Sequence, residues 1–228
     1  MKKHMTLSVF DLSTYLGVNP DTIKRWVRQG KLPVLPKGTD LRFEKKDLEK
    51  WAALHNIRLN LSDKKSGERQ NQIDVSLSQA LENGGIYSDI PGNDVVTVLS
   101  SCVKKISQVP DDFKPDLLDR LVEREKALST GVGNGVAIPH PRQQLSYLPH
   151  PVITVNFLAS PVDYNALDGR PVSILFCILC PSLQYHLHLL SALSFCLRDA
   201  DFIRFIKSRP QMDQLVEKTA MLQETNPL

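Results

Sequence analysis

The sequence predicts a mixed α/β protein preceded by a small, mainly α-helical domain. Residues 1–57 contain short amphipathic segments with helix start and stop signals. Residues 58–75 are rich in Lys, Ser, Asn, Gln and Asp and lack helical or strand periodicity. Residues 76–228 alternate helical patterns with strand-length runs rich in β-branched residues. We therefore expect two domains joined by a polar linker.

Composition places the chain among ordinary globular proteins. Of its 228 residues, 42% are hydrophobic and 23% are charged. No window approaches 18 uninterrupted apolar residues, and the first residues lack the apolar core of a signal peptide, so we expect no membrane span. Four cysteines do not suggest a disulfide framework, and we expect reduced thiols in a cytoplasmic protein.

Charge is divided unevenly between the two parts of the chain. Residues 1–60 carry a net charge of +6, whereas residues 61–228 carry a net charge of −3. A small basic domain attached to a larger, mildly acidic one suggests two partners of different kinds.

Three helices are expected in the N-terminal domain. Asn19-Pro20-Asp21 is a helix start, with an Asn cap, a proline at the first helical position and an acid in the first turn. Gly17 and Gly30 are helix stops. The expected elements are a helix within residues 7–17, a second helix over residues 19–29, a hairpin or wing within residues 32–43, and a third helix that begins at Asp47.

The second of these helices has a basic outer face. Ile23, Trp26 and Val27 can face a core, which leaves polar and basic residues to project outward. A short helix, a tight turn and a second helix with this face form a helix-turn-helix pattern, which can enter the major groove of DNA. The alternative is a solvated basic face on a three-helix unit. The residues expected to project outward are Thr22, Lys24, Arg25 and Arg28.

This segment resembles the MerR/excisionase-type helix-turn-helix family over residues 6–55. The matching pieces are Leu16-Gly17-Val18, Thr22-Ile23-Lys24-Arg25-Trp26, Gly30-Lys31-Leu32-Pro33, and Arg42-Phe43 before Asp47-Leu48. The resemblance implies that residues 19–28 are the recognition helix and residues 37–42 the wing, and that the protein binds duplex DNA as a homodimer. The expected DNA contacts are Thr22, Lys24, Arg25, Arg28, Lys31 and Arg42.

The larger domain shows both kinds of periodicity. Helical spacing alternates with β-rich runs of strand length, which indicates an α/β domain with buried strands. The expected helices lie within residues 95–107, 116–128, 185–199 and 199–208, and the expected strands within residues 151–159 and 171–181.

A glycine-rich stretch leads to a histidine between two prolines. Gly131, Gly133 and Gly135 occupy every second position, so the backbone there can approach a bulky anion. Pro139 and Pro141 fix the backbone on both sides of His140, which suits a nucleophile at a strand end. An ordinary surface loop is the alternative for a histidine in this setting. No nucleotide P-loop pattern is present, and we expect no cofactor.

The remaining histidines and cysteines are weaker candidates. His186 and His188 lie in a helical pattern, and half-buried structural histidines are the alternative for both. Cys177 and Cys180 form a CxxC within a buried strand, where their side chains would point to opposite faces, which favours packing over metal or redox chemistry. Without further ligands nearby, we expect no metal site.

Residues 76–224 resemble the enzyme IIA domain of the fructose, mannitol and nitrogen-regulatory class of the bacterial phosphoenolpyruvate-dependent sugar phosphotransferase system. This resemblance implies a mixed β-sheet flanked by helices. The residues that carry it are Arg124-Glu125, the run Ser129-Thr130-Gly131-Val132-Gly133-Asn134-Gly135-Val136-Ala137-Ile138-Pro139-His140, Ala166-Leu167-Asp168-Gly169, Pro171-Val172, His186-Leu187, Leu189-Leu190 and Leu193.

The resemblance also assigns roles by position. It implies that His140 is the phosphoacceptor, that Arg124 steadies the phosphoryl group and that His186 is a second histidine of the site. A neutral imidazole nitrogen is a nucleophile near neutral pH when the other nitrogen is held as a donor. Phosphoryl transfer needs positioning and charge stabilisation, which an arginine and loop N–H groups can supply. The expected phosphate loop comprises Thr130, Gly131, Gly133 and Gly135.

Three functions are open on the sequence alone. The first is a phosphorylation-responsive transcription regulator, related to nitrogen regulation, that receives its phosphoryl group from an HPr-type carrier. The second is a transferase-type phosphoryl carrier of a sugar transport system that passes the group to an enzyme IIB, with residues 1–57 as a protein-docking module. The third is a regulator that acts on other proteins by contact alone.

Overall fold

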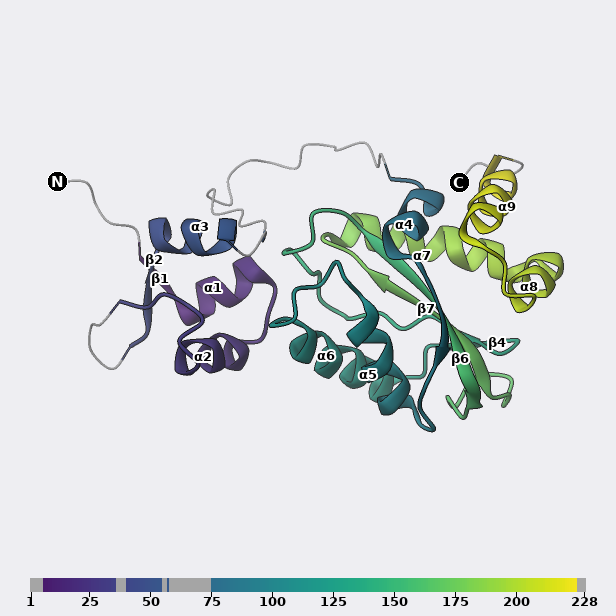
Figure 1. The fold of residues 1–228 in the computed structure, drawn as a ribbon, viewed down its shortest axis with the longest axis horizontal. Helices are drawn as coiled ribbons and strands as arrows, with labels where there is room; N and C mark the ends of the chain where they lie inside the picture. Colours follow the sequence, from purple (N-terminus) through teal and green to yellow (C-terminus); the bar gives the residue numbers. More distant parts are fainter. Residues whose placement is uncertain (1–5, 36–39, 55–56, 58–74, 225–228) are drawn as a thin grey trace. The chain divides into compact units, whose positions relative to one another are not determined.

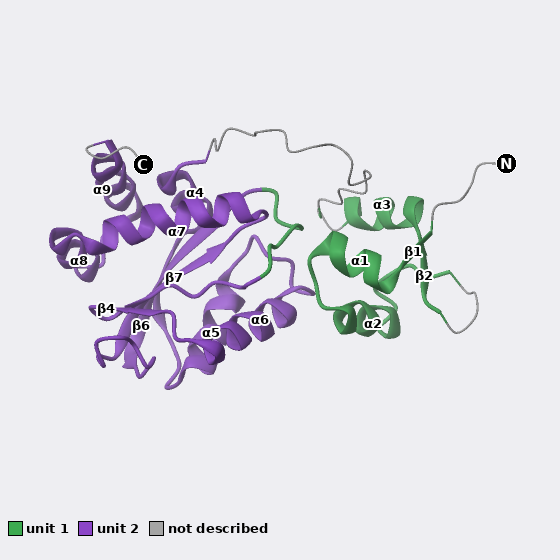
Figure 2. Ribbon diagram, turned by 180° about the vertical axis from the view of Figure 1, so that it is seen from behind, with its two compact units in different colours: residues 1–71, 143–149 green, residues 72–142, 150–228 purple. Residues whose placement is uncertain are grey.

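A computed structural model describes residues 6–35, 40–54, 57 and 75–224. The predicted linker, apart from Val75, and residues 37–39 of the predicted wing lie outside these residues. Within the described part of the chain, no helix is long and apolar enough to cross a membrane. The chain divides into two compact units, the first comprising residues 1–71 and 143–149 and the second comprising residues 72–142 and 150–228 (Figure 2).

The first unit contains the predicted helix-turn-helix. Helix α1 (Val9–Leu16) starts at the capping residue Ser8 and ends at Gly17, whose φ of +61° places it in the left-handed region. Helix α2 (Pro20–Arg28) starts at Asn19, whose side chain accepts the Asp21 N–H. These boundaries confirm the predicted turn, and helix α3 (Lys45–Leu54) follows two residues earlier than predicted.

The first unit also contains a two-stranded sheet, and the sequence did not predict this sheet. Strand β1 (Thr6–Ser8) pairs with β2 (Arg42–Glu44) in the antiparallel sense, with Leu7 opposite Phe43. Both of these residues are buried, so Leu7 contributes to the core from a strand rather than from the first helix. Three residues are too few to show an alternating pattern in the sequence.

The segment of residues 143–149 groups with the first unit, although residues of the second flank it on both sides (Figure 2). The Ser146 hydroxyl donates a hydrogen bond to the Tyr15 carbonyl at 2.8 Å. Leu145 and Leu148 are buried. The chain therefore leaves the second unit three residues after His140 and re-enters it at His150.

The second unit is built on a mixed sheet in the order β3-β6-β7-β5-β4. Strand β6 is parallel to β3 and antiparallel to β7, β5 is parallel to β7, and β4 is antiparallel to β5. The predicted strands at residues 151–159 and 171–181 are confirmed as β6 and β7, which pair with each other in the interior of the sheet. The bounds are β3 (Ile86–Ile90), β4 (Gly131–Gly133), β5 (Val136–Ala137), β6 (Val152–Val162) and β7 (Val172–Leu179).

Helices cover both faces of this sheet (Figure 1). One face packs against α4, α7, α8 and α9, and the alternate positions Ile153, Val155 and Phe157 of β6 belong to the core on this side. Helices α5 and α6 lie on the other face (Figure 1). The bounds are α4 (Leu77–Gly84), α5 (Val95–Lys105), α6 (Lys114–Ala127), α7 (Leu183–Arg198), α8 (Ala200–Lys207) and α9 (Met212–Glu224).

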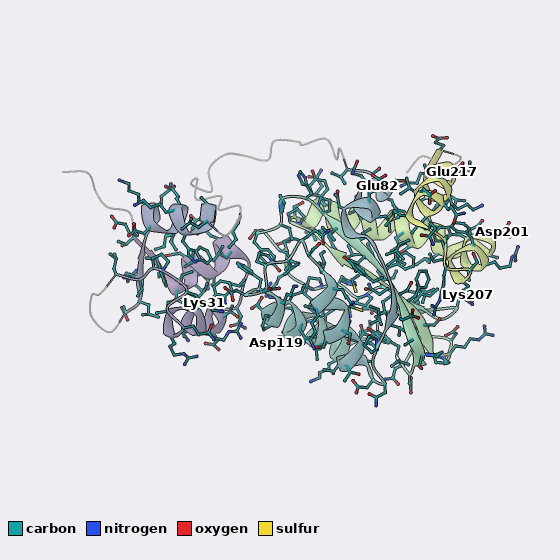
Figure 3. All side chains as sticks on the ribbon, viewed as in Figure 1. Lys31, Glu82, Asp119, Asp201, Lys207 and Glu217 are labelled. Atoms are coloured by element: carbon teal, nitrogen blue, oxygen red, sulfur yellow. The ribbon has the colours of Figure 1, made fainter. Side chains whose placement is uncertain are left out.

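A close approach between α4 and β6 predicts a strong effect of Gly84→Ala. A Cβ at Gly84 would overlap the Ile153 carbonyl, so helix and strand must separate and the core between them must open. We expect a loss of several kcal/mol of unfolding free energy, measured by urea denaturation. Glu82→Ala, on the exposed side of the same helix (Figure 3), is the matched control and should change it by less than about 0.5 kcal/mol. Equal stabilities of the two variants would contradict this close packing.

Candidate active site

The second unit brings the three predicted site residues together from three elements. Arg124 lies in the last turn of α6, His140 follows β5, and His186 lies in the first turns of α7. The strand pairing extends beyond β5, because the Ile178 N–H donates to the Pro139 carbonyl at 2.9 Å. This bond holds the residue before His140 against β7, and α7 follows β7 directly.

The His140 ring is held in one tautomer. Its Nδ1 lies 2.8 Å from the Ile138 carbonyl oxygen, which can only accept a hydrogen bond. Nδ1 therefore carries the proton and donates it, which leaves Nε2 with a free lone pair. Nε2 is the nucleophilic atom of this ring.

The Arg124 guanidinium reaches that nucleophilic atom. Its Nε lies 3.3 Å from His140 Nε2 and donates to it, while its Nη1 donates to the Leu128 carbonyl at 2.6 Å. The second bond ties the side chain to the segment after its own helix. A cation fixed beside Nε2 can neutralise charge on a phosphoryl group attached there.

His186 lies beside the phosphoacceptor candidate. The centres of the His140 and His186 rings are 5.0 Å apart and the ring planes are tilted by 48°. His186 lies in the first turn of α7, whose N-cap is Ser182, so the positive end of the helix dipole lies near His186. The site therefore combines two imidazoles, a guanidinium and a helix N-terminus.

The surroundings keep the imidazoles neutral. Burial lowers the pKa of His140 from its ordinary value of 6.5 to about 4, and the positive charges of Arg124 and of protonated His186 add to this shift. The hydrogen bond to Ile138 opposes it. Burial and Arg124 also lower the pKa of His186. At neutral pH Nε2 of His140 is therefore unprotonated.

The glycine-rich segment forms a tight hairpin between β4 and β5. Asn134 and Gly135 have φ values of +57° and +81°, the pattern of a two-residue type I′ turn. The Asp168 carboxylate accepts the Asn134 N–H at 2.8 Å, and this hydrogen bond is the largest cause of the lowered pKa of Asp168. A Cβ on Gly131 would overlap Ala166. These glycines permit the turn and the close packing that place the following strand.

The first two N–H groups of the predicted phosphate loop have acceptors in the chain itself. The Thr130 N–H donates to Glu125 Oε1 at 2.7 Å and the Gly131 N–H donates to the Ser129 hydroxyl at 3.0 Å. The loop assignment therefore stays a prediction. The sequence gives Glu125 no role beyond its place in a motif, because a carboxylate beside Arg124 on a charged helix gives no signal of burial.

In the first unit, most of the predicted DNA contacts lie where the sequence placed them. Lys24 and Arg28 are exposed on α2, Lys31 is exposed after it, and Arg42 is exposed in β2. Arg25 is half-buried. Their contact with DNA stays a prediction.

The predicted outward position of Thr22 is wrong. Its side chain is only 5% exposed. Thr22 precedes Trp26 by four residues, so the two share one face of α2, and Trp26 is 1% exposed. The Trp51 indole of α3 packs near Trp26 and donates to the Lys31 carbonyl at 2.6 Å, which fixes the backbone just after α2.

Comparisons with known proteins agree with this geometry. Residues 80–218 match the family Phosphoenolpyruvate-dependent sugar phosphotransferase system, EIIA 2, and residues 6–53 match a helix-turn-helix domain. A nitrogen regulatory protein of Pseudomonas aeruginosa is 36% identical over 146 residues, 63% of this chain and 94% of that protein. A fructose-specific EIIA component of Haloferax volcanii is 38% identical over 92 residues, 40% of this chain and 58% of that protein.

A solved structure shares the fold of the second unit. The crystal structure of the nitrogen regulatory protein IIA-Ntr from Neisseria meningitidis superposes with a TM-score of 0.53 at 23% identity, over 63% of this chain and 98% of that one. The match to the family extends over more than half of the sequence and includes all three site residues. The chain therefore belongs to the EIIA type-2 family of the phosphoenolpyruvate-dependent sugar phosphotransferase system and carries a helix-turn-helix domain before its EIIA domain.

Proposed function

We propose that this protein is a phosphorylation-responsive regulator, in which His140 accepts a phosphoryl group and the helix-turn-helix binds duplex DNA. The observation that carries the proposal is the state of His140. Its ring is neutral and held in one tautomer, and the unprotonated Nε2 accepts a hydrogen bond from Arg124. A structural histidine needs no such arrangement of both nitrogens.

The donor that fits is a phosphohistidine carrier protein of the HPr type. The P–N bond of the donor breaks as the bond between phosphorus and His140 Nε2 forms, and the electron pair of the broken bond returns to the donor imidazole. His140 keeps its Nδ1 proton, so the transfer requires no general base. Arg124 and the α7 N-terminus would stabilise the oxygens of the group in transit.

Exposed leucines beside the site support a protein as the donor. Leu187 follows His186 and is 58% exposed, Leu183 is 54% exposed one turn earlier, and Leu128, whose carbonyl binds Arg124, is 69% exposed. Apolar side chains exposed around a reactive group are typical of protein–protein contact surfaces.

The helix-turn-helix and its basic residues support the regulatory part of the proposal. The relative from Pseudomonas aeruginosa is named a nitrogen regulatory protein. The chain runs from His140 into the segment of residues 143–149, which belongs to the same compact unit as the helix-turn-helix. A homodimer would present two recognition helices to successive major grooves. Both proposed partners, an HPr-type carrier and DNA, place the protein in the cytoplasm.

The second candidate is a phosphoryl carrier for sugar transport that passes its group from the HPr-type protein to an enzyme IIB. The name of the Haloferax volcanii relative, a fructose-specific EIIA component, favours it. In this case the helix-turn-helix is a protein-docking module, and DNA binding separates the two candidates.

His140 should be the single stoichiometric phosphorylation site. Incubation with enzyme I, an HPr-type carrier and phosphoenolpyruvate should give one acid-labile phosphate per chain, measured by intact-protein mass spectrometry. His140→Ala should abolish the label, because Nε2 is the nucleophile. His188→Ala, on the same helix as His186, is the control and should keep it. A label that survives His140→Ala would refute the assignment.

The titration of His140 should reflect its low pKa. We expect the ring resonances of the unphosphorylated protein to titrate near pH 4, so that the ring stays neutral and reactive down to about pH 5. Arg124→Gln removes a positive charge that opposes protonation and should raise the midpoint. NMR of ring-labelled histidine measures both midpoints, with His140→Gln to assign the signal. A wild-type midpoint near 6.5 would contradict the buried, cation-flanked setting.

DNA binding should weaken steeply with salt and should depend on α2. Each phosphate contact contributes about −0.9 to the log–log salt slope, so Arg25→Ala with Arg28→Ala should reduce affinity and flatten the slope. Fluorescence anisotropy on genomic fragments selected by the protein provides the measurement, without and with phosphorylation.

A matched double variant serves as the control for this experiment. Arg204→Ala with Lys207→Ala on α8 has the same spacing and removes the same charge from exposed positions of the second unit. It should leave the slope unchanged, and the α2 variant should still be phosphorylated at His140. If no fragment is preferred over bulk DNA at low salt, the transport candidate takes precedence.

A further inference from the structure

Glu125 is a buried carboxylate that the proposed chemistry does not use. It lies in the last turn of α6 next to Arg124 and is 9% exposed. Both of its oxygens bind Thr130, because Oε1 accepts the backbone N–H at 2.7 Å and Oε2 accepts the hydroxyl at 2.5 Å. A buried charge is costly unless it is well hydrogen-bonded, and these are two charge-assisted bonds to a single residue.

From Thr130, two further hydrogen bonds lead to the phosphoacceptor ring. The Thr130 carbonyl accepts the Ile138 N–H at 3.0 Å, and the Ile138 carbonyl accepts the His140 Nδ1–H at 2.8 Å. The peptide units at residues 130 and 138 are thereby fixed to each other, and the second of them selects the ring tautomer. Glu125 anchors this series to the end of α6.

The contact between Glu125 and Thr130 also affects the other ring nitrogen of His140, Nε2. Arg124 donates to His140 Nε2 and to the Leu128 carbonyl, two residues before Thr130. When Thr130 is held against α6, the segment between Leu128 and Thr130 closes on the helix end and keeps this carbonyl within reach of the guanidinium. Both nitrogens of His140 are therefore positioned from one short stretch of backbone.

We propose that Glu125 is a positioning residue, which acts through Thr130 to hold His140 in its Nδ1–H tautomer with Nε2 toward Arg124. Its carboxylate hydrogen-bonds to Thr130 and not to the ring, so we assign it neither the role of a base nor that of a ligand of the phosphoryl group. The inference rests on the proposed role of His140 as the phosphoacceptor.

The sharpest test changes the hydroxyl that joins Glu125 to the loop. Thr130→Val has nearly the same shape but removes the Oγ1 donor, which leaves a Glu125 oxygen without its partner. Thr130→Ser restores the hydroxyl. Glu123→Gln, an exposed carboxylate on the same helix, is the control for a loss of charge.

Two readouts separate positioning from a general effect on stability. Long-range ¹H–¹⁵N NMR of the unphosphorylated full chain reports which ring nitrogen of His140 carries the proton. Labelling by phosphoramidate, which breaks its own P–N bond and releases ammonia as Nε2 is phosphorylated, reports reactivity without any protein partner.

We expect wild type and Glu123→Gln to show the Nδ1–H tautomer and similar labelling rates, and Thr130→Ser to keep that tautomer and to label faster than Thr130→Val. Thr130→Val should show a mixture of tautomers and label about 10- to 100-fold more slowly, the size of effect that a lost orientation produces. A Thr130→Val protein with reduced thermal stability but the wild-type tautomer and rate would overturn the proposal, because the hydrogen bonds between Glu125 and Thr130 would then serve folding alone.

A second variant keeps the test decisive if Thr130→Val does not fold. Glu125→Gln keeps a carbonyl oxygen for the Thr130 N–H but loses the second acceptor, and should give an intermediate shift in tautomer and rate; wild-type values would overturn the proposal. A wild-type protein that accepts no phosphoryl group from phosphoramidate or carrier would refute the proposed function, while the NMR signature still decides the positioning role.

Discussion

The hydrogen bond from the His140 Nδ1–H to the Ile138 carbonyl determines the chemistry that the site can perform. It fixes the tautomer, and with it the identity of the nucleophilic nitrogen. The geometry of that carbonyl depends in turn on the sheet, because Ile138 is held by Thr130 on one side, and its neighbour Pro139 accepts the Ile178 N–H of β7 on the other. The mixed sheet and the β4–β5 hairpin are thus the means by which the Ile138 carbonyl is placed within hydrogen-bonding distance of the imidazole.

The sequence was sufficient to predict helices and strands that are long enough to show a characteristic residue pattern or that begin at a local capping signal. The buried strands over residues 151–159 and 171–181 are long enough to show enrichment in β-branched residues. The start of the helix at Asn19 is indicated by three consecutive residues. Strands β4 and β5 contain three and two residues, too few for any periodicity to appear. The glycines of this segment suggested an anion-binding loop, and the positive φ values at Asn134 and Gly135 show that the residues between the two strands also form a tight turn.

Residues whose roles depend on contacts between elements were beyond the reach of sequence patterns. Glu125 and Glu123 are alike in a charged helical run, yet only Glu125 is buried, because it faces the segment that returns to β4. Thr22 is a different case. Its polarity favours an exposed position, but its spacing from Trp26 along α2 predicts the buried face on which it lies. Spacing along a helix predicts which residues share a face, and a small polar residue is tolerated on the inner face when packing leaves room for it.

Arg124 has opposite electrostatic relations to the site before and after the proposed transfer. In the unphosphorylated protein it is a cation beside two imidazoles, and its charge adds to the burial that keeps both of them neutral. A phosphoryl group on Nε2 would bring about two negative charges to the atom that Arg124 now contacts, so the same guanidinium would become the partner of the anion. The anion would also favour protonation of His186, 5.0 Å from His140, which reverses the direction of the pKa shift there. One fixed cation thereby helps to keep the nucleophilic nitrogen unprotonated before the transfer and would offset the charge of the phosphoryl group after it.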